Sequence, residues 1–383
     1  MICQLFVLQF VGRKSFALRR KTRSIKLMHR SVSIIQYVII AIFIFLILEI
    51  VLNENYLPIS SMLVTFLTYM ESTILMGIFT VIFLSWYRTN RNSVLVLLYG
   101  LSFATVVIAS FAVLLIFMYE FSGILFTPIL PTSPGTFIWT QEGTIWKVFA
   151  KIYQYSDMAS FFLKWGGTAL ILYHYSHRMG KTKYWFLLSL PLIYFFSVII
   201  YHFHIYDPHE EFEKLIFYGI IALNSTFGGI LFYLSFKLTL KNFKSNEVFG
   251  DYLIMAGYGF MLFFSGSQSI LTNTAYPPFG FATVSSYGLG SYLILIGLYL
   301  SAISVSMDEQ LKNIIKNSTL AESKFLNSIG MSAAEREKKL FKDMLYKAQK
   351  QKEAIKKDIG IEMSISEDDI KEYAKELNDN DVP

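Results

Sequence analysis

Eight separate apolar segments, each about 20 residues or longer, constrain the fold of this 383-residue chain more than any other feature. A helix of that length crosses the hydrocarbon core of a bilayer. Because a helix satisfies its backbone hydrogen bonds internally, we predict an all-α, polytopic transmembrane helix bundle. The eight windows are 33–52, 61–86, 93–119, 155–176, 184–206, 214–236, 251–271 and 281–305.

The composition agrees with this prediction and divides the chain. Charged residues make up only 16% of the chain, against about a quarter in a soluble domain. They are concentrated at the C-terminal end, where residues 306–383 carry 14 basic and 16 acidic side chains. This distribution excludes a soluble enzyme, a disordered chain and a protein with one membrane anchor. We predict a basic cytoplasmic N-terminus (1–32), an eight-span bundle (33–305) and a charged helical tail (306–383).

Basic residues between the spans predict the orientation. The first 48 residues contain eight basic side chains and no acidic one. The connections after the second, fourth and sixth windows add Arg88, Arg91, Arg178, Lys181, Lys183, Lys237, Lys241 and Lys244. The opposite connections carry only Lys147, Lys151 and Lys214. The positive-inside rule therefore places both termini in the cytoplasm, in a multi-pass protein of the cell membrane.

The N-terminal region supports the same interpretation. A basic block directly before an apolar span favours a topology signal over nucleic-acid binding, so no nucleic-acid partner is predicted. Met28 is an alternative first residue. If the first span serves only as a signal anchor, a seven-helix bundle with its N-terminus outside remains. Cys3, the single cysteine, permits neither an intramolecular disulfide nor a cysteine-based metal site.

Polar residues inside the predicted spans are the first candidate site. Glu71, Lys164 and Asn224 lie about nine or ten residues into the second, fourth and sixth windows, which places them at one depth. Asp157 lies on nearly the same helix face as Lys164 and competes for it. Ionisable groups in lipid are costly and point to function. The intramembrane polar layer is therefore either responsive to protons or ligands, or a structural Glu71–Lys164 bridge with Asn224 that fixes helix order.

The longest outer connection contains a second candidate element. Residues 136–149 alternate in a way typical of a small β-hairpin, with a turn at 141–143. A two-residue turn would place Trp139 opposite Trp146 as a cross-strand aromatic pair. This outer flap either covers the bundle from outside or serves as an interfacial aromatic anchor.

One cluster has ligand types that suit a divalent metal at the outer face: His202, His204, Asp207 and His209. On a helix, His202 and His204 would point to nearly opposite sides, so both can bind one ion only where the chain is extended. The alternative is a solvated acidic loop with interfacial histidines. No catalytic motif or other cofactor site is present in the sequence, and we predict that the protein is not an enzyme.

Small residues in several windows predict close helix packing rather than chemistry. They are Gly166, Gly167, Gly228, Gly229, Gly257, Ser265, Gly266, Ser267, Ser285, Ser286, Gly288, Gly290, Ser291 and Gly297.

The C-terminal tail has the pattern of soluble amphipathic helices. The last span continues toward Gly330, Ser332 and Glu335 form a capping box for a helix over about 333–358, and a third helix starts near Ser366. The apolar stripes are narrow and cannot form a core alone. The coiled-coil-like tail is therefore expected to dock on a partner protein, a second copy or the membrane face.

Five segments of the last quarter carry a family resemblance: 276–286, 291–299, 301–306, 322–330 and 364–370. Over about residues 275–377 the chain resembles a family of uncharacterised multi-pass membrane proteins from ammonia-oxidising archaea. The resemblance implies an archaeal cell membrane. It supplies neither an activity nor binding residues.

The predicted function is a seven-helix-plus-anchor sensor that relays an outer or intramembrane event to the cytoplasmic tail. The absence of catalytic motifs and the continuity of the last span with the tail favour this function. A non-catalytic subunit or assembly factor of a membrane complex is the alternative, and a transporter of a small ion or solute is the third hypothesis. Fold-level analogy carries much of this choice.

Overall fold

The residues that the structure describes are almost all helical. The computed structural model describes residues 2–14, 23–53, 58–89, 91, 93–124, 144–173, 180–202, 211–240, 247–266, 279–307, 326, 329–331 and 333–335. Within these ranges every regular element is an α-helix and no strand is present. The all-α prediction is therefore confirmed for the described part of the chain.

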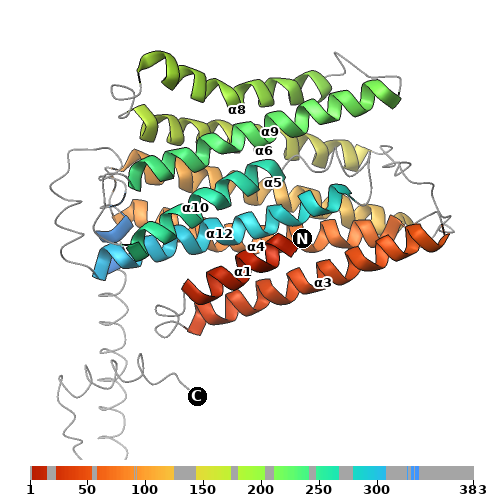
Figure 1. Cartoon of the computed structure of the whole chain (residues 1–383), viewed down its shortest axis with the longest axis horizontal. Helices are drawn as coiled ribbons and strands as arrows, with labels where there is room; N and C mark the ends of the chain where they lie inside the picture. Colours follow the sequence, from red (N-terminus) through yellow and green to blue (C-terminus); the bar gives the residue numbers. More distant parts are fainter. Residues whose placement is uncertain are drawn as a thin grey trace, which may run out of the picture.

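The helices form a bundle of long, roughly aligned rods (Figure 1). They are α1 (Ile2–Lys14), α3 (Arg23–Asn53), α4 (Pro58–Thr89), α5 (Val94–Ile124), α6 (Thr144–Tyr173), α8 (Lys181–His202), α9 (Glu211–Leu240), α10 (Glu247–Gly266) and α12 (Phe279–Met307).

Each predicted window overlaps one long helix of the bundle. Four helices in the described part are long and apolar enough to cross a membrane: 25–52 in α3, 63–89 in α4, 94–119 in α5 and 284–306 in α12. The helices α6, α8, α9 and α10 occupy the other four windows. In α6 the charged Asp157 and Lys164 lower the hydropathy of the segment. The chain thus has the character of an integral membrane protein, with four spans supported by length and composition.

Two helix starts follow from local chemistry. Ser93 precedes α5, and its Oγ accepts a hydrogen bond of 3.5 Å from the backbone N–H of Val96, as expected of an N-cap residue. Gly180 precedes α8 with a φ of 86°, a conformation that glycine adopts without steric cost. Its carbonyl accepts a hydrogen bond of 3.1 Å from the N–H of Tyr184.

The predicted outer hairpin is wrong in its second half. Residues 144–149, expected as a strand, form the first turns of α6. Trp146, Phe149 and Tyr153 are spaced i, i+3 and i+7 and lie half-buried along one helix face. Because the same residues fit a helical period continuous with α6, that continuity outweighs their β propensity. Trp139 and the predicted turn lie outside the described residues.

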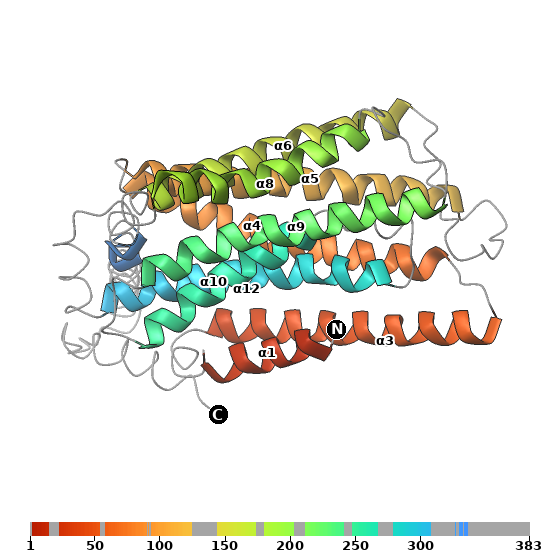
Figure 2. The same ribbon diagram turned by 45° about the horizontal axis from the view of Figure 1, so that its top comes forward.

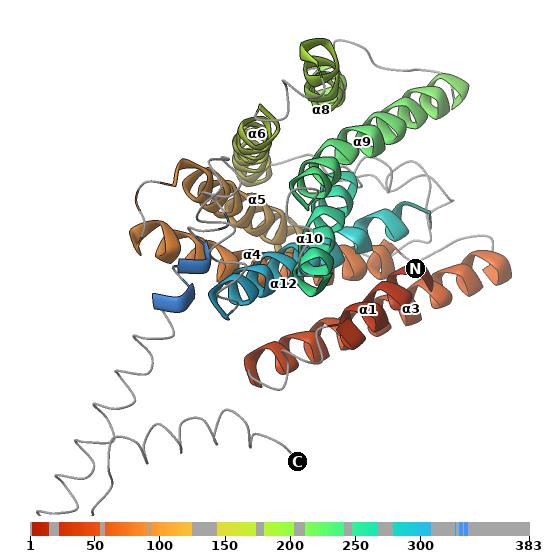
Figure 3. The ribbon, with the colours of Figure 1, turned by 60° about the vertical axis from the view of Figure 1, so that its left-hand side comes forward.

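The helix α12 lies at the centre of the bundle. It packs against α10, α4 and α3, and 83% of its apolar window is buried, against 22% for α3 at the periphery. Figures 2 and 3 show α12 between α4 and α10, with α8 and α3 on the outside. The short α1 lies beside α3, and its Leu8 and Val11 are buried in the core. Part of the segment predicted as a cytoplasmic N-terminus therefore packs on the bundle.

Glycines bring the backbones of α10 and α12 into direct contact. A Cβ added to Gly259 would lie 2.6 Å from the backbone N of Ile294, and one added to Gly297 would lie 2.5 Å from that of Ala256. Gly266 and Gly290 have equivalent positions against the facing helix. The predicted close packing of these last two helices is confirmed, as small residues in membrane helices allow.

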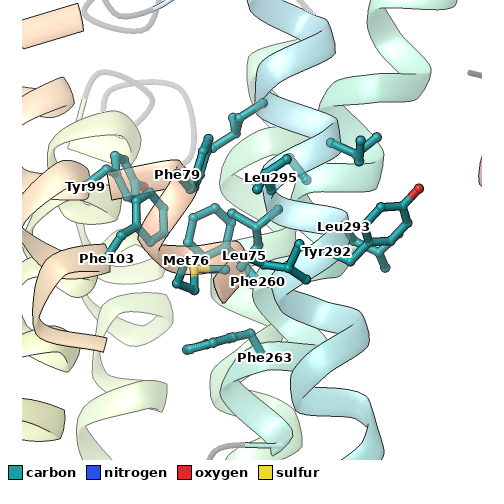
Figure 4. Close-up of a cluster of buried hydrophobic side chains, with 14 of the residues drawn as sticks. Leu75, Met76, Phe79, Tyr99, Phe103, Phe260, Phe263, Tyr292, Leu293 and Leu295 are labelled. Atoms are coloured by element: carbon teal, nitrogen blue, oxygen red, sulfur yellow. The ribbon is translucent and has the colours of Figure 1, made fainter. Parts of the chain in front are cut away.

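A cluster of aromatic rings fills the region between α4, α5, α9 and α10. Figure 4 shows Phe79, Phe103, Tyr99 and Phe260 pointing toward one another. The ring centroids of Phe79 and Phe103 are 4.6 Å apart, and those of Tyr99 and Phe260 are 5.6 Å apart. All four side chains are buried. Aromatic stacking therefore joins helices that are distant in the sequence.

The long helices alternate in direction, so their basic ends gather at one end of the bundle (Figures 1 and 2). These ends carry Lys26, Arg30, Arg88, Lys181, Lys183 and Lys237, close to the C-terminal end of α12. Leu326, Ile329 and Ala333, which belong to the tail, are buried in the same core. These six basic residues and the start of the tail therefore share one end of the molecule, whereas Lys147 and Lys151 lie in the first turns of α6.

Candidate functional site

The centre of the bundle contains a layer of buried polar side chains, and Glu71 of α4 is its best-defined acid. Only 2% of Glu71 is exposed. Gln36 Nε2 on α3 donates a hydrogen bond of 3.5 Å to Glu71 Oε2. A Cβ added to Gly288 of α12 would lie 2.7 Å from the same oxygen, so the carboxylate lies directly against the α12 backbone. The predicted burial of Glu71 is found, with Gln36 as its neighbour.

Lys164 of α6 is also buried, but it has other neighbours. Its Nζ lies 4.4 Å from the centroid of the Phe263 ring, a cation–π arrangement. Asp157, one of the four predicted layer residues, is the acid that acts on Lys164 electrostatically. The structure therefore does not bring Glu71 and Lys164 into an ion pair, because Glu71 faces Gln36 and Gly288 instead.

Asp157 lies within a group of buried and half-buried tyrosines that the sequence analysis did not identify. The hydroxyls of Tyr69 and Tyr153 are hydrogen-bonded to each other, and Asp157 acts electrostatically on both. It also acts on Tyr194 and Tyr287. Four helices, α4, α6, α8 and α12, supply this group. The arrangement can hold a proton or a hydrogen-bonding ligand between several helices.

A chain of hydroxyls joins α12 to α4 and α5. Tyr287 Oη and Ser110 Oγ are 3.1 Å apart, and Tyr287 is also hydrogen-bonded to Ser72. Ser72 Oγ lies 2.7 Å from Ser291 Oγ. In helices buried in lipid, such hydrogen bonds between side chains hold neighbouring helices in register.

Two further contacts extend this pattern along α12. Gln4 of α1 and Ser285 exchange hydrogen bonds of 2.8 and 3.1 Å. His29 Nδ1 on α3 lies 2.6 Å from the hydroxyl of Tyr292. Polar side chains of α12 therefore contact α1, α3, α4 and α5. Its Gly290 and Gly297 contact α10, and its Gly288 lies against Glu71 of α4.

Other predicted site residues are placed as follows. Trp146 lies in the first turns of α6, and its indole Nε1 is buried without a hydrogen-bond partner in the described part of the chain. The side chains of Asn224 and His202, and residues His204, Asp207 and His209, lie outside what the structure describes. The metal hypothesis at the outer face stays a prediction.

The polar residues that the sequence analysis missed have a regular spacing that can be recognised in the sequence. Thr65, Thr68 and Ser72 of α4 are spaced i, i+3 and i+7 in an otherwise apolar helix, and all three are buried. This polar stripe faces α12, because Ser72 and Glu71 contact Ser291 and Gly288 there. Its members are small and uncharged, so a search restricted to ionisable groups overlooks them.

The fold and this site define a helical integral membrane protein with a polar layer at its centre. No family model, curated protein or solved structure matches the chain.

Proposed function

We propose that the chain is an eight-span, multi-pass membrane protein with both termini in the cytoplasm, which senses an outer or intramembrane event and relays it to its tail. One observation carries the proposal: α12 contacts the polar layer with its middle and the tail with its C-terminal end. A movement of α12 caused in the layer would therefore reach the tail without any other connection.

The tail contact is formed by small and apolar side chains. Leu326 and Ile329 are fully buried, and Gly330 packs directly against Val305 near the end of α12. Met331, on the same short helical segment, is 48% exposed. The start of the tail is thus docked on the end of α12, on the side where the basic helix ends gather. The predicted helices beyond residue 335 lie outside the described residues.

The relay is tested by changing one hydroxyl in the layer and measuring the tail. We expect Tyr287→Phe to change the distance distribution between spin labels at Met331 and Arg88, in a Cys3→Ser background. The variant removes two hydrogen bonds of about 0.6 kcal/mol each, which together shift a two-state population about sevenfold. Pulsed electron paramagnetic resonance in nanodiscs provides the distances.

Tyr155→Phe is the matched control, since Tyr155 of α6 is 70% exposed. It removes the same hydroxyl group from the surface and is expected to leave the distribution unchanged. An unchanged distribution in Tyr287→Phe, with normal helicity by circular dichroism, contradicts the relay.

The docking of the tail gives a separate prediction. In Gly330→Leu the new Cβ would overlap Val305, so the tail segment is expected to leave the end of α12. Overpacking of this kind costs about 1–3 kcal/mol, so cleavage by trypsin after Lys324 or Arg336 should become about tenfold faster or more. Mass spectrometry of the timed digest locates and quantifies the cuts.

Met331→Leu changes an exposed neighbour and is expected to be cleaved at the wild-type rate. Equal rates for Gly330→Leu and the wild type would mean that the docked segment does not depend on this contact.

A further inference from the structure

Three buried oxygen atoms between α3, α4 and α12 lack hydrogen-bond partners in the described part of the chain. They are Gln36 Oε1, Thr68 Oγ1 and Glu71 Oε1. Gln36 and Thr68 are completely buried, and Glu71 is 2% exposed. A polar group buried without a partner costs free energy, and three in one place call for a common explanation.

The three side chains belong to one location. Gln36 and Glu71 are joined by the 3.5 Å hydrogen bond, and Thr68 lies one turn before Glu71 on the same face of α4. Gly288 closes the third side: a Cβ there would lie 2.7 Å from Glu71 Oε2 and 3.4 Å from Thr68 Cγ2. Since glycine has no side chain, the Glu71 carboxylate and the Thr68 side chain have room beside the α12 backbone.

The chemistry of these groups is uniform. A carboxylate, an amide carbonyl and a hydroxyl are hard oxygen ligands, which suit alkali and alkaline-earth cations rather than the softer transition metals. The groups of three or more histidine, cysteine or acidic residues that typically hold a metal are absent from the described residues. One carboxylate oxygen and two neutral oxygens point to a cation bound by one charge and two dipoles.

The charge of the site decides which cation fits. Glu71 is the one acid that contributes an unpartnered oxygen here. Lys164 and Asp157 face elsewhere, because Lys164 lies over Phe263 and the half-buried Asp157 acts on the tyrosine group. One carboxylate neutralises one positive charge, whereas a divalent ion would leave a net charge within the bundle, at a high cost in lipid.

We propose that Gln36, Thr68 and Glu71 form a binding site for one monovalent metal cation, with sodium as the probe ion. The ion satisfies the three unpartnered oxygens and ties α3 to α4 beside α12. The site goes beyond the proposed relay, because the ion binds and stabilises the bundle whether or not the tail responds.

The test uses the purified full-length chain in nanodiscs. Thermal unfolding is followed by circular dichroism in sodium chloride and in choline chloride at equal ionic strength, and ²²Na⁺ binding is measured directly. We expect saturable binding of one ion and a rise in Tm of about 3 °C in saturating sodium. Glu71→Gln should lose both effects, since it removes the neutralising charge.

Two further variants make the result specific. Gly288→Ala introduces a methyl group whose nearest neighbours are the flexible end of Glu71 and a methyl group of Thr68, so the fold should be kept while sodium binding weakens. Glu213→Gln changes an exposed acid on α9 and should bind sodium as the wild type does.

Equal Tm values in sodium and choline together with no saturable ²²Na⁺ binding would overturn the site. Wild-type binding in Glu71→Gln would do so as well. If Glu71→Gln does not fold, Gly288→Ala decides, and undiminished binding in that variant overturns the site. Sodium binding without a change in the Met331–Arg88 distance supports the site, because the proposed binding does not depend on the relay.

Discussion

Gly297→Ala is expected to destabilise the bundle by about 2–3 kcal/mol, although alanine is the better helix former. The new Cβ would lie 2.5 Å from the backbone N of Ala256 and 2.7 Å from the carbonyl O of Tyr252. Backbone atoms of a packed helix cannot move aside as a flexible side chain does, so α10 and α12 must separate. Unfolding by SDS in mixed micelles, followed by circular dichroism, measures the loss.

Gly166→Ala is the matched control, because a Cβ on this α6 glycine meets nothing within 4 Å. It should keep or slightly raise the free energy of unfolding, since alanine loses less backbone entropy than glycine in a helix. If both variants had equal stability, the close approach of α10 and α12 would not limit the stability of the bundle.

The same glycines show how far sequence reasoning reaches. Gly266, Gly290 and Gly297 were expected at a close helix contact because of their small size, and they lie there. Gly259, which contacts the backbone of Ile294, was missed, and Gly166 has open space in place of the expected contact. Composition indicates that a helix has a small-residue face. The rotation of its neighbour decides which of those residues meet a backbone.

The helices themselves were easier to predict, since length and hydropathy act within one segment. Residues 144–149 are the exception, because β-branched and aromatic residues over a short stretch fit strand and helix periods alike. There the continuity of α6 decides the outcome. The pattern of this short stretch, taken by itself, does not reveal that continuity.

For the candidate site, burial was predictable and pairing was not. Glu71 and Lys164 are both buried, as their depth in apolar windows suggested. Their partners depend on where each helix face points: Glu71 turns to Gln36 and Gly288, and Lys164 to Phe263. The position of a residue along the helix axis follows from counting residues. The direction in which its side chain points around that axis follows only from how the helices pack.

Phe260 of α10 is the second position where a large effect is expected, because its ring joins two other helices. It stacks on Phe236 of α9 with centroids 5.3 Å apart and planes 13° apart. On the other side it contacts Tyr99 and Phe103 of α5, with centroids 5.6 and 6.1 Å away (Figure 4). Only 1% of Phe260 is exposed. Lipid therefore cannot fill the space that its removal leaves.

Phe260→Ala is expected to lower the free energy of unfolding by about 3–5 kcal/mol through the cavity and the lost ring contacts. Phe111→Ala is the control, since Phe111 of α5 is 54% exposed and lipid can replace the contacts of its ring. Both are measured by SDS unfolding in the same micelles. If the two variants lose free energies of unfolding that differ by less than about 1 kcal/mol, the cavity left by Phe260 collapses. The helices α9 and α5 then pack against α10 without this ring. A larger difference would mean that ring packing in the aromatic cluster, rather than apolarity alone, holds these helices together. Moving an apolar side chain from lipid into a protein core supplies little driving force by itself.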